Sequence, residues 1–192
     1  VGASYTGNLS SAYRMLYPDM VVGALSSSAP VMAKEDFIEY DAYVTEVAGP
    51  ECTDKIRQVF GTIESSLDNS QELNRIKEMF TASDVRSDID FLYLAADVAA
   101  AAVQYGSRDR FCKMINSETP LEKYAEFARM LFSTWGVDAV SFTFQSAENL
   151  DPDNYLNGFG MRQWLYQSCT EYGYWQSAHP NPVMSMRSTL IS

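Results

Sequence analysis

Residues 1–30 read VGASYTGNLSSAYRMLYPDMVVGALSSSAP. The stretch opens with a sharp turn, Gly2-Ala3-Ser4-Tyr5-Thr6, and continues as a predicted helix from about Gly7 to Tyr17, which Pro18 ends. A short apolar run, Met20 to Ser27, follows between turn residues, which is typical of a strand buried on both faces of a parallel sheet. Turn, helix and strand in this order form half of a βαβ unit, so the sequence predicts an α/β fold.

The turn is close to the G-x-S-x-G pattern of a nucleophile elbow, with Thr6 in place of the last glycine and Gly7 directly after it. An elbow needs small residues on both sides of the serine because the strand-to-helix bend packs tightly against neighbouring backbone. We therefore predict that Ser4 is a nucleophile and that the backbone N–H of Tyr5 donates to an oxyanion. The alternative is a serine that caps an ordinary helix.

After Pro30, apolar residues recur at three- and four-residue intervals, as in amphipathic helices. The predicted helices cover residues 35–48, a segment capped by Thr53, residues 70–80, residues 90–105 and a segment opened by Thr119-Pro120. Successive helices with short connections are typical of an all-α insertion.

The chain is therefore predicted to have three parts: a core segment at residues 1–33, a helical insertion at 34–150 and a return to the core at 151–192. Residues 149–160 have the composition of a loop. Residues 161–169 are apolar on both parities, which fits a strand or a helix.

Composition excludes several classes of function. Fourteen basic residues against 25 acidic ones give a net charge of -11, which argues against nucleic acid as a partner. No apolar run reaches the ~20 residues that a membrane-spanning helix needs. Three cysteines without C-x-x-C spacing and a single histidine lack the known zinc patterns. We expect no metal and no cofactor.

Two separated blocks of sequence carry a family resemblance. The first combines Gly2 to Gly7, Tyr17-Pro18, Val22-Gly23-Ala24 and Ser27-Ser28-Ala29-Pro30-Val31, and the second runs from Arg162 to Gly173. Together they resemble the serine peptidases of family S28, although Ala3 stands where that family usually has glycine. The resemblance implies an α/β-hydrolase core that is interrupted by a helical cap. It also implies cleavage of peptides near a terminus, beside proline or another small residue, through an acyl-enzyme on Ser4.

The resemblance suggests roles for further residues. Trp164, Tyr166 and Gln167 are expected near the substrate pocket, with a buried core position as the alternative. Glu171 could meet a substrate ammonium or form an ordinary salt bridge. A disulfide between Cys52 and Cys169 is expected to tie the cap to the core, with two buried thiols as the alternative. Location in the secretory pathway, lysosomal or extracellular, follows from the same comparison, and a homodimer stays open.

The family's catalytic acid and base should follow Cys169 in segments that this sequence does not contain, so we expect a fragment of a longer protein. His179 lies in a proline-rich loop ahead of both segments, which disfavours it as the base. Asp151 and Asp153 are more simply turn formers. Two other classes remain: an esterase or other α/β-hydrolase, and a helical interaction domain or pseudo-enzyme without catalysis.

Overall fold

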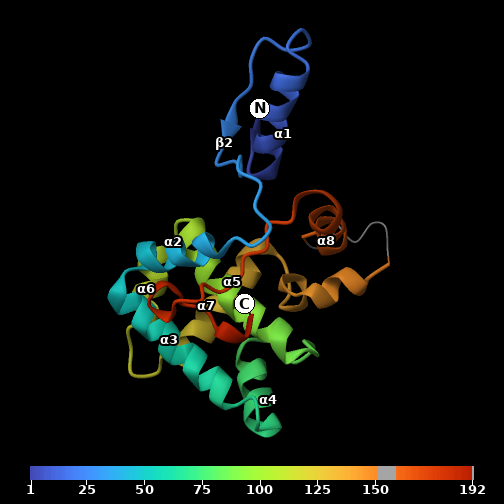
Figure 1. The fold of residues 1–192 in the computed structure, drawn as a ribbon. Coiled ribbons are helices and arrows are strands. Elements are labelled where there is room, and N and C mark those ends of the chain that lie inside the picture. Colours follow the sequence, from blue (N-terminus) through green and yellow to red (C-terminus); the bar gives the residue numbers. More distant parts are fainter. Residues whose placement is uncertain (151–158, 192) are drawn as a thin grey trace.

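The computed structural model describes residues 1–150 and 159–191. Residues 1–33 form an N-terminal arm that projects from a body of helices, and the C-terminal residues run back across that body (Figure 1). We call residues 38–148 the helical body. The arm and the body are joined near α8 (Met161–Gln167), which lies beside the base of the arm.

The arm contains the predicted α/β unit. Strand β1 (Gly2–Ala3) leads into helix α1 (Tyr5–Leu16), and β2 (Ser26–Ser27) pairs with β1 in parallel, with Gly2 opposite Ser26 and Ala3 opposite Ser27. The order of the predicted elements is confirmed, but the strand expected from Met20 is only two residues long. The pairing is limited to the contacts around the elbow, where the backbone N–H groups of Gly2 and Ser4 donate to the carbonyls of Leu25 and Ser27, both at 3.0 Å.

Helix α1 buries little of its surface. Gly7 is its only buried residue, and Leu9, Tyr13 and Leu16 are 48%, 45% and 71% exposed. The two short strands contact the helix and the rings of Trp164 and Tyr172 contact Tyr5 at its start, but these contacts leave most of its apolar face exposed. The apolar face of α1 is therefore available for further packing.

The helical body is an all-α assembly around one apolar core. Its helices are α2 (Ile38–Ala48), α3 (Pro50–Ser65), α4 (Ser70–Met79), α5 (Asp88–Gln104), α6 (Arg108–Ile115) and α7 (Pro120–Trp135), followed by the 3-10 turns η1 (Val140–Phe142) and η2 (Phe144–Glu148). The Tyr124 ring is fully buried, and its hydroxyl donates to the Ala95 carbonyl at 2.6 Å, so the polar atom of this side chain is satisfied.

Local sequence signals explain most helix ends. The side chain of Asn69 accepts the backbone N–H of Glu72, and Ser87 accepts that of Asp90, so both are N-caps. Pro120 occupies the first helical position of α7, as predicted. At the other end of α7, Gly136 has φ 67°, the left-handed conformation that glycine adopts without strain.

One helix prediction was wrong, and one helix was missed. Helix α3 begins at Pro50, so Thr53 lies inside its first turn, where its hydroxyl donates to the Thr45 carbonyl at 3.1 Å instead of capping the helix. Helix α6 was not predicted. It is eight residues long and buries only Phe111 and Ile115, which leaves too short an apolar pattern for detection by periodicity.

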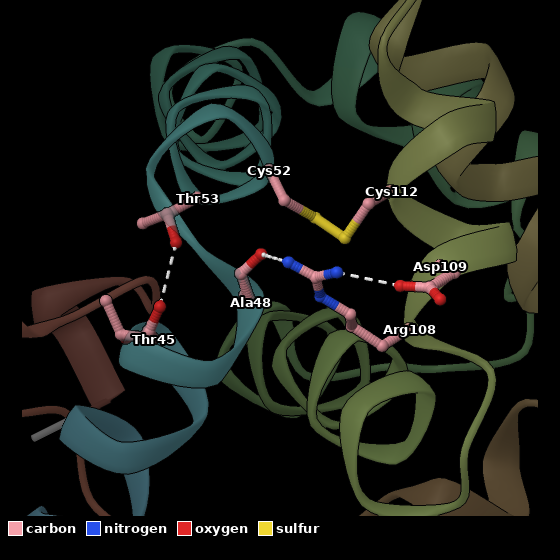
Figure 2. Close-up of a disulfide and its surroundings, with 7 residues drawn as sticks. All are labelled: Thr45, Ala48, Cys52, Thr53, Arg108, Asp109 and Cys112. Carbon is pink, nitrogen blue, oxygen red and sulfur yellow. Dashed lines mark hydrogen bonds and ion pairs between the residues drawn. A yellow bond between two sulfur atoms is a disulfide. The ribbon is translucent and has the colours of Figure 1, made fainter.

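The disulfide joins Cys52 to Cys112, which corrects the expected pairing of Cys52 with Cys169. The Cα atoms of Cys52 and Cys112 are 5.1 Å apart, within the span of a disulfide, whereas Cys169 is exposed and free. Figure 2 shows the bond between α3 and α6, next to Arg108, which donates to the Ala48 carbonyl at 2.8 Å. The bond therefore ties helices within the body together.

The C-terminal segment resolves the ambiguity of residues 161–169 in favour of a helix. Helix α8 continues into a π-helical turn, Ser168–Tyr172. Beyond it, Tyr174 and Trp175 donate backbone hydrogen bonds to the carbonyls of Lys34 and Glu35, and Phe37 donates to that of Trp175 at 2.7 Å. We call residues 34–37 and 173–175 the neck, because they connect the arm and α8 to the helical body.

Candidate active site

Ser4 stands at the bend between β1 and α1 in a strained backbone conformation, with φ 55° and ψ -133°. Non-glycine residues rarely adopt positive φ, and such strain is concentrated at functional sites. The Ser4 side chain makes no capping hydrogen bond to the helix, although Ser4 occupies the N-cap position. This geometry is that of an elbow, and it disfavours the alternative of a plain helix-capping serine.

The glycines around Ser4 are there because backbone approaches them closely. A Cβ on Gly2 would lie 2.1 Å from the Thr6 carbonyl oxygen, and one on Gly7 would lie 2.9 Å from the Ala29 Cβ. The hydroxyl of Thr6 donates to the Ala3 carbonyl at 2.7 Å and so closes the turn. Gly7 thus allows α1 to pack closely against Ala29. Thr6, in the place of the last glycine of the pattern, stabilises the turn through its hydrogen bond to Ala3.

We expect Gly7→Ala to destabilise the protein by about 1 to 3 kcal/mol, because the new methyl group overpacks the contact between α1 and Ala29. Gly61→Ala is the matched control. A Cβ on Gly61 meets nothing within 4 Å, so this change should stabilise helix α3 by about 0.5 to 1 kcal/mol. Thermal melting of the two variants tests the pair, and equal shifts would contradict the expectation.

The backbone N–H of Tyr5 has no acceptor among the described residues, since it opens the first turn of α1. The Tyr5 ring makes edge contacts with the rings of Trp164, at 5.9 Å between centroids, and Tyr172, at 5.4 Å. The Tyr172 hydroxyl in turn donates to the Pro30 carbonyl and accepts a hydrogen bond from Asn8. The two sequence blocks of the family resemblance are therefore in contact at the elbow.

A cavity of about 380 Å³ lies between the elbow and the helical body. Ser4 contributes to its wall from the arm, and α8 contributes Met161 and Trp164. The rest of the lining comes from the helical body and the C-terminal segment: Tyr40, Asp97, Ala100, Ala101, Gln104, Tyr105, Trp135, Phe142, Phe159 and Gln176. This is the size of a small-molecule or dipeptide site.

Six of the thirteen lining residues are aromatic, and several of their rings contact one another. The Trp135 and Phe142 rings stack at 5.6 Å, and Phe159 makes edge contacts with both. Tyr105 meets Trp135 edge-on at 5.2 Å. Rings packed against one another in this way form a rigid surface for an apolar side chain or a proline ring.

The polar part of the wall centres on α2 and α5. The Tyr40 hydroxyl donates to the Gln104 side-chain oxygen at 2.6 Å, and burial raises the pKa of Tyr40 to about 12, so this phenol stays protonated. The Asp97 carboxyl faces the cavity, and its side chain is 40% exposed. Loss of hydration raises the pKa of the Asp97 carboxyl, and the nearby positive charge of Arg187 offsets part of this rise.

A raised carboxyl pKa in the folded protein sets the sign of a pH effect. The contribution of Asp97 to stability is fully present below the unfolded-state pKa of about 3.9 and is lost as the pH rises through the higher folded-state value. We expect the melting temperature of the parent minus that of Asp97→Asn to be largest in acid and to fall towards neutral pH. Melting curves of both proteins across this range test the expectation, which a flat or rising difference would contradict.

The structure brings together only some of the predicted site residues. Trp164 lines the cavity with Ser4, whereas Tyr166, Gln167 and Glu171 do not, and Tyr166 is 71% exposed. His179 does not line it either: its Nδ1 accepts the backbone N–H of Asn181, and its own backbone N–H donates to Asp41. Asp151 and Asp153 lie outside the described residues.

Sequence reasoning missed the lining residues of the helical body because it assigned their aromatic side chains to the core. One signal was available. Asp97 is the single charged residue in the apolar run from Leu92 to Val103, and a carboxylate in such a run usually has a partner or a role. Within residues 1–150 and 159–191, no cluster of three metal-ligating side chains occurs and no helix is long and apolar enough to cross a membrane.

Comparison with known proteins identifies the family. The model of the family described as serine carboxypeptidase S28 matches residues 1–190, so this chain belongs to that family. The family implies an α/β-hydrolase fold, of which the arm holds one parallel βαβ unit.

The relatives include Arabidopsis thaliana "Probable serine protease EDA2", which is 32% identical over 92% of this chain and 36% of its own length. Human "Thymus-specific serine protease" is 26% identical over 91% of this chain and 39% of its own length. Human "Lysosomal Pro-X carboxypeptidase" is 38% identical over 33% of this chain and 14% of its own length. The chain thus spans well under half the length of these relatives.

Proposed function

We propose that this chain is the nucleophile-bearing part of a serine peptidase, in which Ser4 attacks the substrate and the Tyr5 N–H stabilises the oxyanion. The observation that carries the proposal is the backbone of Ser4, strained at φ 55° with its side chain free of capping contacts and facing the aromatic cavity. Membership of the serine carboxypeptidase S28 family supports it.

The proposed reaction is acyl transfer. The Ser4 Oγ attacks the peptide carbonyl carbon while a general base takes its proton, and the Tyr5 N–H donates to the oxygen that becomes negative. The C–N bond then breaks, and the base returns the proton to the departing amine. Water releases the acyl group from Ser4 by the same steps. We assign the base and its orienting acid to the part of the relatives' length that this chain does not span.

We further propose that residues 34–150 act as a cap that limits the site to peptide ends. The proposal is supported by a cavity of about 380 Å³, which has room for about two residues of a peptide. The rings of Trp135, Phe142 and Phe159 would favour proline or a small apolar residue beside the cleaved bond, in keeping with the name of the Pro-X relative.

A location in the secretory pathway, lysosomal or extracellular, completes the proposal. The Cys52–Cys112 disulfide supports it, because disulfides persist in oxidising compartments. The lysosomal relative points the same way.

The test is labelling of the intact protein, as its gene encodes it, with a fluorophosphonate probe, followed by peptide mapping. We expect modification at Ser4 that a proline-containing dipeptide product blocks. Labelling that an ester substrate blocks and peptides do not would instead indicate an esterase. A folded protein without labelling at Ser4 would overturn the proposal in favour of a pseudo-enzyme or helical interaction domain.

A further inference from the structure

The cavity beside Ser4 has one charged side chain on the described part of its wall, that of Asp97. Its carboxylate accepts no hydrogen bond from the described residues, and its contact with Arg187 is an ion pair at 3.6 Å between Oδ1 and Nη2, beyond hydrogen-bond distance. The Asp97 carboxylate, which faces the cavity, therefore has acceptor sites that no described protein donor occupies. It therefore invites a ligand group that carries N–H donors.

The ionic group formed by Asp97, Arg187 and Asp41 contains two carboxylates and one guanidinium. Arg187 is fully buried and lies 3.9 Å from Asp41 as well as 3.6 Å from Asp97, so one cation serves two carboxylates. Asp41 is satisfied separately, because it accepts backbone hydrogen bonds from His179 at 2.8 Å and Met186 at 3.4 Å. With all three side chains ionised, the group carries one net negative charge, and Asp97 presents that charge to the cavity.

The arrangement distinguishes a cation from an anion as the ligand. The Arg187 side chain is 0% exposed, and its Nη1 donates to the Gln176 carbonyl at 2.9 Å, so the guanidinium does not reach the cavity. A substrate carboxylate would therefore meet the Asp97 carboxylate first and be repelled. A protonated amine would gain both the carboxylate and the negative faces of the surrounding rings.

We infer that the cavity binds a positively charged group of a peptide substrate and that Asp97 is its counter-ion and a specificity-determining residue. The inference rests on the proposed peptidase function and adds the chemical class of the substrate. The cation is either the α-ammonium group of the peptide or a lysine or arginine side chain. These two sources share one chemistry, and substrate variants separate them.

The test compares kcat/KM of the intact protein and its Asp97→Asn variant on matched peptides. One pair differs by acetylation of the α-amino group, and a second, fully acetylated pair differs by lysine against glutamine. We expect Asp97→Asn to lower kcat/KM about tenfold to a hundredfold on the cationic peptides and to leave the uncharged peptides within about twofold. Loss confined to the free-amine peptides identifies the α-ammonium group, and loss confined to the lysine peptides identifies the side chain.

Asp109→Asn is the matched control, because it removes the same charge from a side chain that is 90% exposed and outside this cavity. This variant should leave kcat/KM unchanged on both the cationic and the uncharged peptides. An equal effect of Asp97→Asn on charged and uncharged peptides, or no effect, would overturn the inference.

A second measurement needs no variant and so does not depend on the folding of Asp97→Asn. In the parent protein, a free-amine dipeptide should protect Ser4 from the fluorophosphonate probe at about tenfold lower concentration than its acetylated form. Equal protection by the two forms would overturn the inference while leaving the peptidase proposal intact. Absence of labelling at Ser4 would instead mean that the peptidase proposal itself has failed.

Discussion

Ser4→Gly should abolish peptide hydrolysis and at the same time make the protein more stable. The reaction loses its nucleophile, so kcat/KM should fall by at least about four orders of magnitude. The backbone at φ 55° and ψ -133° suits glycine, whose insertion releases strain of about 1 to 3 kcal/mol against a chain-entropy cost of about 0.5 to 1 kcal/mol. A net gain of about 1 kcal/mol should be visible in thermal melting.

Ser4→Ala is the control for this experiment. It removes the hydroxyl but keeps a Cβ in the strained conformation, so activity should be lost to the same extent without the gain in stability. If Ser4→Gly melts below Ser4→Ala, the strain at the elbow is not real. If Ser4→Ala retains the parent's activity, Ser4 is not the nucleophile.

Replacing both Cys52 and Cys112 with alanine should lower the free energy of unfolding by about 4 kcal/mol. The bond spans a sequence separation of 60, and opening a loop of that length frees the unfolded chain by about this amount. For a chain of this size we expect the melting temperature to fall by about 8 to 16 °C. Thermal melting of the intact protein under non-reducing conditions measures the change.

Cys169→Ala is the matched control, because Cys169 is exposed and unpaired. It should alter stability by less than about 0.5 kcal/mol. Alkylation of the unreduced parent should modify Cys169 and neither of the other cysteines. Recovery of a peptide linked through Cys52 and Cys169 would contradict the structure and restore the pairing suggested by the family resemblance.

The elbow could be predicted from sequence because its constraints are local. Small residues at Gly2 and Gly7 are required within a few positions of Ser4, and the contacts that require them involve Thr6 and Ala29, which are near in sequence. The helix at residues 70–80 was predicted from the spacing of its apolar residues, which is also a local signal, and the structure adds its N-cap, Asn69. Signals that depend only on neighbouring residues can be recognised without knowing the tertiary structure.

The cavity could not be predicted in the same way, because its wall is assembled from distant segments. Trp135 has the pattern of a core residue and Phe159 lies in a stretch with the composition of a loop, and neither neighbourhood shows that the ring faces a cavity. The disulfide was missed for a similar reason: helix α6, which carries Cys112, was not recognised, so the partner that folding brings to Cys52 was absent from the argument.

The neck has a mechanical consequence. The chain passes from the arm into the helical body through residues 34–37 and returns from α8 to the body through residues 173–175, and backbone hydrogen bonds join these two passages side by side. Gly173, at φ 71°, allows the passages to touch, since a Cβ there would lie 3.2 Å from the Cα of Glu35. Two hydrogen-bonded segments resist twisting better than a single linker does. The neck therefore restrains rotation of the helical body relative to the arm. If the chain acts as the proposed peptidase, this restraint would fix the width of the opening beside Ser4 and so limit the size of the peptide that enters.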